Sequence, residues 1–137
     1  GDVAVSEVMV PREDVIALST TASVEENLDR MSGQPHVRYP LVGEEMEDFL
    51  GIVYVPSVID RIDELQAGEI DFADLAAPPV SVDPDTSVSD LVDRFQSESQ
   101  ELALVETDRQ VVGLVTATEA FEEVMGDLED PLDEAWM

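Results

Sequence analysis

The sequence predicts an α+β fold made of two β-α-β-β-α units that pack with pseudo-twofold symmetry. Three observations support this expectation. An amphipathic helix pattern with a capping motif occurs twice, at residues 22–31 and 86–95. The strand and glycine pattern "LGIVYV" returns later in the chain as "VGLVTA". A chain of 137 residues has room for one domain, or for two small units that share a core.

The first unit is predicted as strand, helix, strand, strand and helix, over residues 15–18, 23–33, 37–42, 50–55 and 57–66. Its first helix has an apolar stripe at helical spacing, formed by Val24, Leu28 and Met31. Ser23 and Glu26 have the spacing of a capping box at the start of this helix. The segment "GEEMED" joins the two later strands as a hairpin loop. Pro56 fits the first turn of the last helix, where a missing N–H costs nothing.

The second unit repeats this order over residues 80–82, 87–98, 101–106, 110–116 and 117–126. The matching apolar stripe is formed by Val88, Val92 and Phe95. Ser87 and Asp90 have capping-box spacing, with Asp in place of the usual Glu or Gln. The segment "TDRQ" is the predicted hairpin loop, and Gly126 is the predicted helix stop. Residues 66–72 are expected to be a short linker between the units.

The predicted division of the chain is a first unit over residues 1–66, a second unit over 67–130 and an acidic tail over 131–137. The tail contains Trp136, for which the sequence indicates no partner. A three-stranded unit of this size is marginally stable alone. We therefore expect the two units to fold as one cooperative module with two equivalent clefts between its halves.

Acidic residues dominate the composition. There are 33 Asp and Glu residues against six basic residues, all of them Arg, and the net charge is −27. Such self-repulsion destabilises a compact fold in dilute buffer, but molar salt shortens the screening length to about 3 Å. We interpret the charge as the solvated surface of a halophilic protein. A surface this acidic also argues against binding DNA or RNA.

The composition offers little for catalysis or for metal binding. The chain has no Cys, and His36 is its single His. The sequence contains no recognisable nucleophile with a basic partner, so we do not expect an enzyme. The acidic runs "EEMED" and "EDPLDE" are interpreted as solvated surface, with weak divalent-cation binding as the alternative.

The sequence gives no sign of a membrane span or of a signal peptide. The longest mostly apolar run, "LGIVYVPSVI", is about half of the ~20 residues that a membrane helix needs. The chain begins with Gly rather than Met, and we expect it to be a piece of a longer protein.

The chemistry differs between the two copies at one repeated position. In the second copy a strand ends in Thr116 at the head of a helix, where unpaired N–H groups and the helix dipole favour phosphate. Glu119, three residues later, has a carboxylate that can accept hydrogen bonds from a ribose diol. The alternative is that Thr116 is an N-cap and Glu119 a first-turn acid. The first copy has Tyr54 and Ser57 at these positions.

These segments resemble a pair of cystathionine-β-synthase (CBS) domains. "VGLVTATEAFEEV" is similar to that family's G-h-h-T-x-x-D segment, where h is apolar. The similarity is greatest to the CorC/hemolysin-C-like (CNNM-type) magnesium and cobalt transport proteins. Three segments carry it in order: "VMVPREDV" at 8–15, "HVRYPLV" at 36–42 and "GLVTATEAFEEVMGDLED" at 113–130.

The resemblance assigns roles to six residues in an adenine-nucleotide site. Thr116 matches the phosphate-contacting Thr, and Glu119 stands where the family has a ribose-contacting Asp. Arg38 matches an Arg that reaches the nucleotide phosphates, a task that suits a planar, permanently charged guanidinium. Val80 and Ala103 align with the adenine position. His36 matches a family His that can contact the ligand, and an ordinary surface histidine is the alternative.

The resemblance also implies a function. It implies a cytoplasmic regulatory module that binds ATP or AMP, alone or with magnesium, and that forms a homodimer. It further implies that a membrane-embedded ion-transport domain belongs to the same parent chain. The ligand would then favour one arrangement of the module and so control transport. The alternative function is a structural dimerisation module whose nucleotide cleft is empty or degenerate; the net charge of −27 favours it, because a polyphosphate is repelled unless salt or magnesium screens the charge. In the first copy, Tyr54 and Ser57 indicate a closed or altered cleft.

Overall fold

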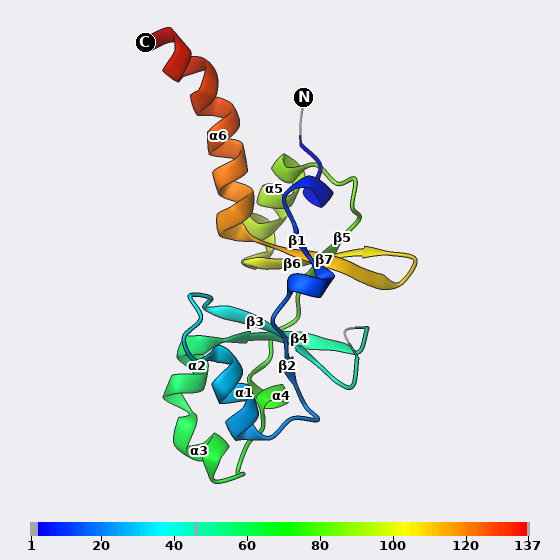
Figure 1. The fold of residues 1–137 in the computed structure, drawn as a ribbon, viewed down its shortest axis with the longest axis vertical. Coiled ribbons are helices and arrows are strands. Elements are labelled where there is room, and N and C mark those ends of the chain that lie inside the picture. Colours follow the sequence, from blue (N-terminus) through cyan, green and yellow to red (C-terminus); the bar gives the residue numbers. More distant parts are fainter. Residues whose placement is uncertain (1–2, 46, 137) are drawn as a thin grey trace. The chain divides into compact units, whose positions relative to one another are not determined.

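The computed structural model describes residues 3–45 and 47–136, and it describes side chains for residues 3–45 and 47–126. Its contacts divide the chain into two compact units. The central unit is Ile16–Pro79, and the terminal unit combines Gly1–Val15 with Val80–Met137 (Figure 1). The predicted boundaries after residues 66 and 130 follow the sequence repeats, and they stay a prediction.

The central unit follows the predicted order of strand, helix, strand, strand and helix, with two corrections: the first strand is at 18–19 rather than 15–18, and the predicted last helix at 57–66 is divided at Arg61 into two helices. Its strands are β2 (Leu18–Ser19), β3 (Arg38–Val42) and β4 (Phe49–Tyr54). Its helices are α1 (Val24–Met31), α2 (Val55–Asp60), α3 (Ile62–Gln66) and α4 (Phe72–Leu75). The middle strand β3 pairs in parallel with β2 and antiparallel with β4. Pro56 lies in the first turn of α2, as predicted.

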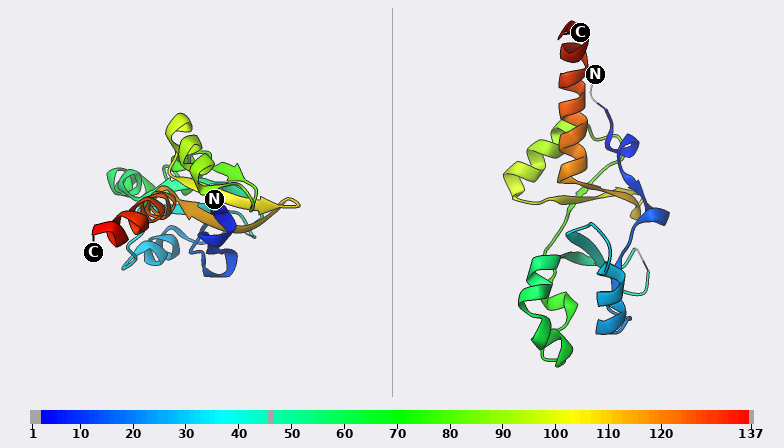
Figure 2. Two further views of the ribbon diagram at one scale, coloured as in Figure 1. Left: turned by 90° about the horizontal axis from the view of Figure 1, so that it is seen from above. Right: turned by 60° about the vertical axis from the view of Figure 1, so that its left-hand side comes forward.

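The terminal unit repeats this order and adds one strand. Its sheet has the order β1-β7-β6-β5, built from β1 (Val10–Pro11), β5 (Val80–Val82), β6 (Leu102–Thr107) and β7 (Gln110–Thr116). Its helices are α5 (Val88–Glu98), α6 (Ala117–Trp136) and two 3-10 turns, η1 (Val5–Glu7) and η2 (Arg12–Asp14). Figure 2 shows α5 and α6 on the same face of this sheet.

Both predicted helix caps are formed. In α1, Ser23 Oγ accepts the Glu26 amide at 3.1 Å, and the Glu26 carboxylate accepts the Ser23 amide at 3.4 Å. In α5, Ser87 Oγ accepts the Asp90 amide at 3.1 Å. These bonds satisfy amides that the first helical turn leaves unpaired, which is why the predicted helix starts agree with the observed ones.

One arginine in each repeat ties the first helix to the strand region before it. Arg30 of α1 donates through Nη1 to the Ala17 carbonyl at 3.2 Å. Arg94 of α5 donates in the same way to the Ser81 carbonyl at 2.8 Å. These two arginines occupy matching positions of the repeated segments, so their role is structural in both units.

Each unit has its own apolar core. The central core contains Leu18, Tyr39, Leu41, Val53, Val58, Leu65 and Phe72. The terminal core contains Val5, Val80, Val82, Val88, Leu91, Phe95, Ala103, Val105, Val115 and Ala120. The predicted stripes of α1 and α5 pack against these two cores. Among the described residues, the Tyr39 hydroxyl is the buried side-chain polar group that lacks a hydrogen-bond partner.

The segment before each repeat pairs with the last strand of the other repeat. Residues 3–15, the first leader, precede the central unit but lie in the terminal unit, where β1 pairs with β7. Residues 68–79, the second leader, precede β5 but lie in the central unit. There Ala77 and Ile52 of β4 exchange hydrogen bonds of 2.7 and 2.8 Å. Each repeat therefore depends on a leader that lies elsewhere in the sequence.

A glycine lies where each leader crosses a strand. A Cβ atom on Gly113 of β7 would lie 2.5 Å from the Val10 carbonyl oxygen and 2.6 Å from Met9 Sδ. Gly51 of β4 has a φ of +149°, and a Cβ there would lie 2.9 Å from the Ala77 carbonyl oxygen. The glycine that recurs in "LGIVYV" and "VGLVTA" thus leaves room for the leader backbone.

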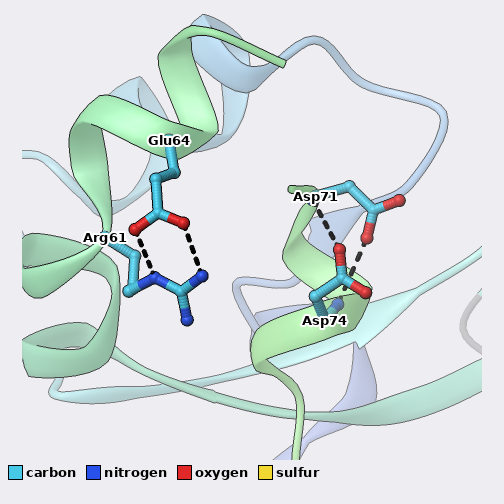
Figure 3. A network of polar contacts seen from close by, with 4 residues as sticks. All are labelled: Arg61, Glu64, Asp71 and Asp74. Atoms are coloured by element: carbon cyan, nitrogen blue, oxygen red, sulfur yellow. Dashed lines mark hydrogen bonds and ion pairs between the residues drawn. The ribbon is translucent and has the colours of Figure 1, made fainter. Parts of the chain in front are cut away.

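Two further predicted boundaries were wrong. Gly126 does not stop α6, which continues to Trp136. The predicted linker at 66–72 ends inside α4, whose first turn is capped by Asp71 (Figure 3). Asp71 Oδ1 accepts the Asp74 amide at 3.2 Å, and Asp74 Oδ2 accepts the Asp71 amide at 2.9 Å. The Trp136 side chain lies outside the described residues.

Figure 3 also shows an exposed ion pair where α2 ends and α3 begins, between Arg61 at the junction and Glu64 of α3. Arg61 donates to Glu64 through Nε at 2.7 Å and through Nη2 at 2.6 Å. The hydrogen bonds from Arg61 hold the pKa of Glu64 below its ordinary value. Water screens such a pair strongly, so it fixes the local geometry more than it stabilises the fold.

Candidate functional site

The terminal unit places Thr116 at the end of β7, on the sheet face that points away from its helices. Ala103 of β6 and Val115 of β7 are register partners, and both belong to the core beneath α5 and α6. The neighbouring pair, Leu102 and Thr116, points to the opposite face because successive strand side chains alternate. The chain enters α6 directly after Thr116.

Thr116 and Glu119 are bonded to each other. Glu119 Oε1 accepts the Thr116 hydroxyl at 2.9 Å and the Thr116 amide at 3.1 Å. Thr116 Oγ1 in turn accepts the Glu119 amide at 3.2 Å. Both side chains are half-buried. These reciprocal bonds have the form of a capping box at the start of α6, which agrees with the N-cap interpretation of the pair.

The start of α6 offers fewer unpaired amides than the sequence suggested. The amides of Thr116 and Glu119 are used within the capping box, and the Ala117 amide donates to the Glu101 carbonyl at 2.8 Å. A phosphate cannot rely on these three N–H groups. What the site presents instead is the Thr116 hydroxyl and the second carboxylate oxygen of Glu119, Oε2, which takes part in none of these bonds.

Val80 and Ala103 lie side by side on β5 and β6, where they are register partners. Their exposed fractions are 1% and 0%, and both side chains belong to the terminal core. The side chains therefore cannot line an open site. Only the backbone of these two residues remains available to contact a ligand.

In the central unit, Arg38 and Tyr54 are cross-strand partners on β3 and β4. The Arg38 guanidinium carbon lies 4.4 Å from the centre of the Tyr54 ring, which is the geometry of a cation–π contact. Arg38 is half-buried, and Tyr54 is 41% exposed. The Tyr54 ring therefore occupies the position that Thr116 has in the other repeat and orients the guanidinium there.

His36 lies just before β3 and is exposed. Its ring packs edge-on against Tyr39, with ring centres 5.9 Å apart. Burial raises the pKa of the Tyr39 hydroxyl. This contact gives His36 a structural partner in its own unit, in line with the interpretation of His36 as a surface strand histidine.

The matching position of the central unit has no hydroxyl–carboxylate pair. Tyr54 is the residue before α2, and its side chain makes no capping hydrogen bond. Ser57 stands where the terminal unit has Glu119, so a ribose diol would find no carboxylate there. Of the two repeats, the terminal one has both the hydroxyl and the carboxylate that the sequence predicted for nucleotide contact at this position.

The terminal unit also has a hollow that the sequence analysis did not predict. It measures about 650 Å³ and lies between α5 and α6. Its lining is Val92, Phe95, Gln96, Ser99, Gln100, Glu101, Ala117, Thr118, Phe121 and Glu122. Thr116 and Glu119 do not line it. The one signal in the sequence was Phe121, an aromatic residue on a helix otherwise rich in acids, and its side chain is 54% exposed.

Neither a metal cluster nor a membrane-spanning helix occurs in the described part of the chain. Within residues 3–45 and 47–126, no three His, Cys, Asp or Glu side chains are grouped so as to hold a metal ion. No described helix combines the length and the apolar character needed to cross a bilayer.

Comparison with known proteins identifies the repeat. The sequence model of the CBS domain matches residues 5–64 and again residues 68–126. Over 131 residues the chain is 30% identical to the magnesium and cobalt efflux protein CorC of Pasteurella multocida, covering 95% of this chain and 43% of that protein. The chain spans less than half the length of such curated relatives.

Solved structures with this fold include nucleotide complexes. One is the CBS domain of the bacterial CNNM/CorC family Mg²⁺ transporter in complex with ATP, with a TM-score of 0.80 and 24% identity over 90% of this chain and 87% of that one. Another is a CBS-domain pair with bound AMP from Klebsiella pneumoniae, with a TM-score of 0.76 and 22% identity over 90% of this chain and 98% of that one. At this level of identity the likeness establishes the fold.

Proposed function

The chain belongs to the CBS domain family, as a tandem pair, and we propose that it binds an adenine nucleotide through Thr116 and Glu119 of its terminal unit. The observation that carries the proposal is the pairing of one hydroxyl and one carboxylate where β7 meets α6. ATP and AMP complexes of related CBS structures support the choice of ligand.

Binding requires the capping box to exchange one bond. The single proton of the Thr116 hydroxyl is donated to Glu119 Oε1, so the hydroxyl must rotate to donate to a phosphate. Glu119 Oε1 then keeps the Thr116 amide, while Oε2 accepts from the ribose hydroxyls. The new bond to phosphate replaces the bond from the Thr116 hydroxyl to Glu119 Oε1, so only the ribose bonds to Oε2 are a net gain, and we expect moderate rather than tight binding.

The remaining four predicted residues have secondary roles in the proposal. The backbones of Val80 and Ala103 border the adenine. Arg38 belongs to the central unit, and its action on the phosphates stays a prediction from the resemblance. The Tyr54 ring holds the Arg38 guanidinium in a defined orientation, which reduces the side-chain entropy that Arg38 would lose on binding a ligand. His36 is the least supported of the six, because it packs on Tyr39.

We further propose that nucleotide binding regulates a membrane ion-transport domain in the parent chain and that the module lies in the cytoplasm. The similarity to CorC proteins and the partial coverage of their length support this role. Regulation would follow from a difference in nucleotide affinity between two arrangements of the module. We propose no enzymatic activity and no binding of nucleic acid, which the net charge of −27 opposes.

A homodimer is part of this proposal. Phe121 lines the hollow between α5 and α6, and Met125 follows one helical turn later on α6; their side chains are 54% and 36% exposed. An aromatic side chain beside an apolar hollow suits an isologous interface, in which each Phe121 enters the hollow of the partner. Sedimentation equilibrium of Phe121→Glu should then detect monomers where the natural chain forms dimers.

A purely structural dimerisation module is the second candidate function. Two observations favour it. The capping box already satisfies Thr116 and Glu119 within the protein, so these residues have a structural use without any ligand. The net charge of −27 also repels a polyphosphate unless salt or magnesium screens it.

Calorimetry with two matched variants separates the two functions. ATP and AMP are titrated with and without magnesium, in molar KCl, into the natural chain, Thr116→Ala and Ser87→Ala. Ser87 caps α5 as Thr116 caps α6, so both variants lose a cap worth about 1 kcal/mol of stability. Only Thr116→Ala should weaken ATP binding, by roughly ten-fold, because a charge-assisted bond is lost.

Adenosine is the matched ligand for the same experiment. It keeps the ribose that Glu119 would hold but lacks the phosphate that Thr116 would contact. Thr116→Ala should therefore leave adenosine binding nearly unchanged. An absence of binding heat for ATP, AMP and adenosine to the natural chain would leave only the structural role.

A further inference from the structure

The first leader is attached to the terminal unit through its backbone. The Val5 amide donates to the Thr86 carbonyl at 2.8 Å, and the Val88 amide donates to the Val3 carbonyl at 2.8 Å. Between these bonds the Val5 side chain is fully buried in the terminal core. This attachment fixes the leader beside the start of α5.

A second attachment joins the leader to β7. Pro11 of β1 is the register partner of Gly113, and the Gly113 backbone approaches Val10 and Met9 closely enough to exclude any side chain. Thr116 lies three residues further along the same strand, about 10 Å away at the rise of an extended chain. One short strand therefore carries both the leader and the proposed nucleotide site.

We infer that pairing of the first leader with β7, called its seated state, is coupled to nucleotide binding at Thr116. The inference rests on the proposed function. A phosphate that takes the proton of the Thr116 hydroxyl from Glu119 alters the junction of β7 and α6, and β7 is the strand with which β1 of the leader pairs. Such coupling is reciprocal, so the factor by which nucleotide favours the seated leader equals the factor by which the seated leader favours nucleotide.

The first leader connects β7 to the central unit, so its pairing with β7 can affect that unit. It continues through Val15 directly into the central unit, so a change in its seating acts on that unit through the covalent backbone. The second leader crosses β4 at Gly51 in the same way, but β4 ends at Tyr54, without a hydroxyl–carboxylate pair. The second leader is therefore an internal control for the first.

Hydrogen exchange of the natural chain, followed by mass spectrometry, tests the coupling. Exchange is measured in molar KCl with and without Mg-ATP, while calorimetry under the same conditions verifies binding. Peptides that cover residues 3–11 should exchange at least about five-fold more slowly with ATP, the lower end of typical coupling. Peptides that cover residues 68–79 should change by less than two-fold, as expected for a leader without a nucleotide site at its strand.

Each other outcome overturns the inference in a recognisable way. If ATP binds but residues 3–11 exchange unchanged, the coupling is wrong and the proposed function stands. If both leaders slow equally, ATP merely stabilises the whole fold, and the coupling is again wrong. If calorimetry detects no binding of ATP, both the inference and the proposed function fail.

A pair of core variants provides a second measurement. Val5→Ala and Val82→Ala each remove two methyl groups from the same core, but only Val5 belongs to the leader. Val5→Ala should raise the dissociation constant for ATP by about three-fold or more, since a less populated seated state lowers apparent affinity. Val82→Ala should change it by less than two-fold. Equal effects of the two variants would contradict the coupling.

Discussion

Replacing Gly113 with Ala tests whether the leader crossing determines this glycine. The new Cβ would lie 2.5 Å from the Val10 carbonyl oxygen, well inside the 3.0 Å that Cβ atoms essentially never approach. The nearest obstacle is backbone, which cannot rotate away as a side chain does. The leader must therefore move by about half an ångström or more, and its pairing with β7 and the packing of Met9 must loosen.

The expected cost follows from two opposing effects. Overpacking of this kind costs about 1–3 kcal/mol. Removing a glycine restricts the unfolded chain and returns about 0.4–1 kcal/mol. Gly113→Ala should thus lower the free energy of unfolding by about 1–2 kcal/mol, which corresponds to roughly 3–6 °C in melting temperature for a chain of this size.

Urea unfolding followed by circular dichroism measures this change, because urea leaves the ionic strength constant for so acidic a protein. Gly126→Ala is the matched control. Within the described residues, no neighbouring segment lies within 4 Å of the methyl group that Ala would add there, and Gly126 is helical, so Ala should raise stability by about 0.5–1 kcal/mol. A Gly113→Ala protein as stable as the natural chain would refute the steric role of the leader.

Three further predictions concern the core and the charge. Tyr39→Phe removes a buried hydroxyl without a partner, so urea unfolding near pH 7 should find it neutral or up to about 1 kcal/mol more stable. Burial raises the pKa of Tyr39 above the value of about 10 that it has in the unfolded chain. Its titration therefore leaves the free energy of unfolding unchanged below about pH 10 and lowers it as pH rises through the folded-state pKa. In Tyr39→Phe this alkaline loss of stability should shrink. Asn27→Leu should cost about 2 kcal/mol, because Asn27 pairs with both the amide and the carbonyl of Ser19, at 3.0 and 2.8 Å. The urea midpoint of the natural chain should rise from dilute buffer to 1 M KCl, and a midpoint independent of salt would contradict the halophilic interpretation.

The sequence predicted the order of the main strands and helices because their determinants are local, but it did not predict β1, α4 or the break between α2 and α3. The apolar stripes of α1 and α5 and the caps at Ser23 and Ser87 act within one or two turns, where helical spacing alone brings the groups together. Gly126 failed as a stop signal because a glycine ends a helix only when the chain turns after it. Here its backbone stays helical, and the only cost is lower helix propensity.

The exchange of leaders was beyond prediction from local patterns. β1 is two residues long, and Ala77 forms an isolated bridge, so neither segment has a period to detect. The sequence signal for it was the recurrence of a glycine at the matching positions 51 and 113 of the two repeats. A glycine inside a strand signals the close approach of another backbone, but it does not say which segment approaches.

The sequence predicted the positions of Thr116 and Glu119 and the N-cap alternative, but not the bond from the Thr116 hydroxyl to the Glu119 carboxylate; the ligand roles of the two residues stay a prediction. Thr116 and Glu119 were correctly placed where a strand meets a helix. Their spacing is, however, that of a capping box as much as that of a ligand site, since both need an oxygen acceptor near the same amides. Sequence spacing cannot distinguish these uses, because the distinction depends on which acceptor receives the single proton of the Thr116 hydroxyl.

The two copies differ at this position, and the difference supports the proposal that only the terminal unit holds a nucleotide. In β4 the cross-strand partners are Arg38 and Tyr54, and a cation–π contact holds both side chains. In β7 the partner of Thr116 is Leu102, which makes no polar demand on the hydroxyl. Among the described side chains, Glu119 is therefore the polar competitor for the Thr116 hydroxyl, and a ligand needs to replace that one bond. We therefore expect the terminal unit, where the cross-strand neighbour is apolar, to be the one that exchanges an internal hydrogen bond for a nucleotide.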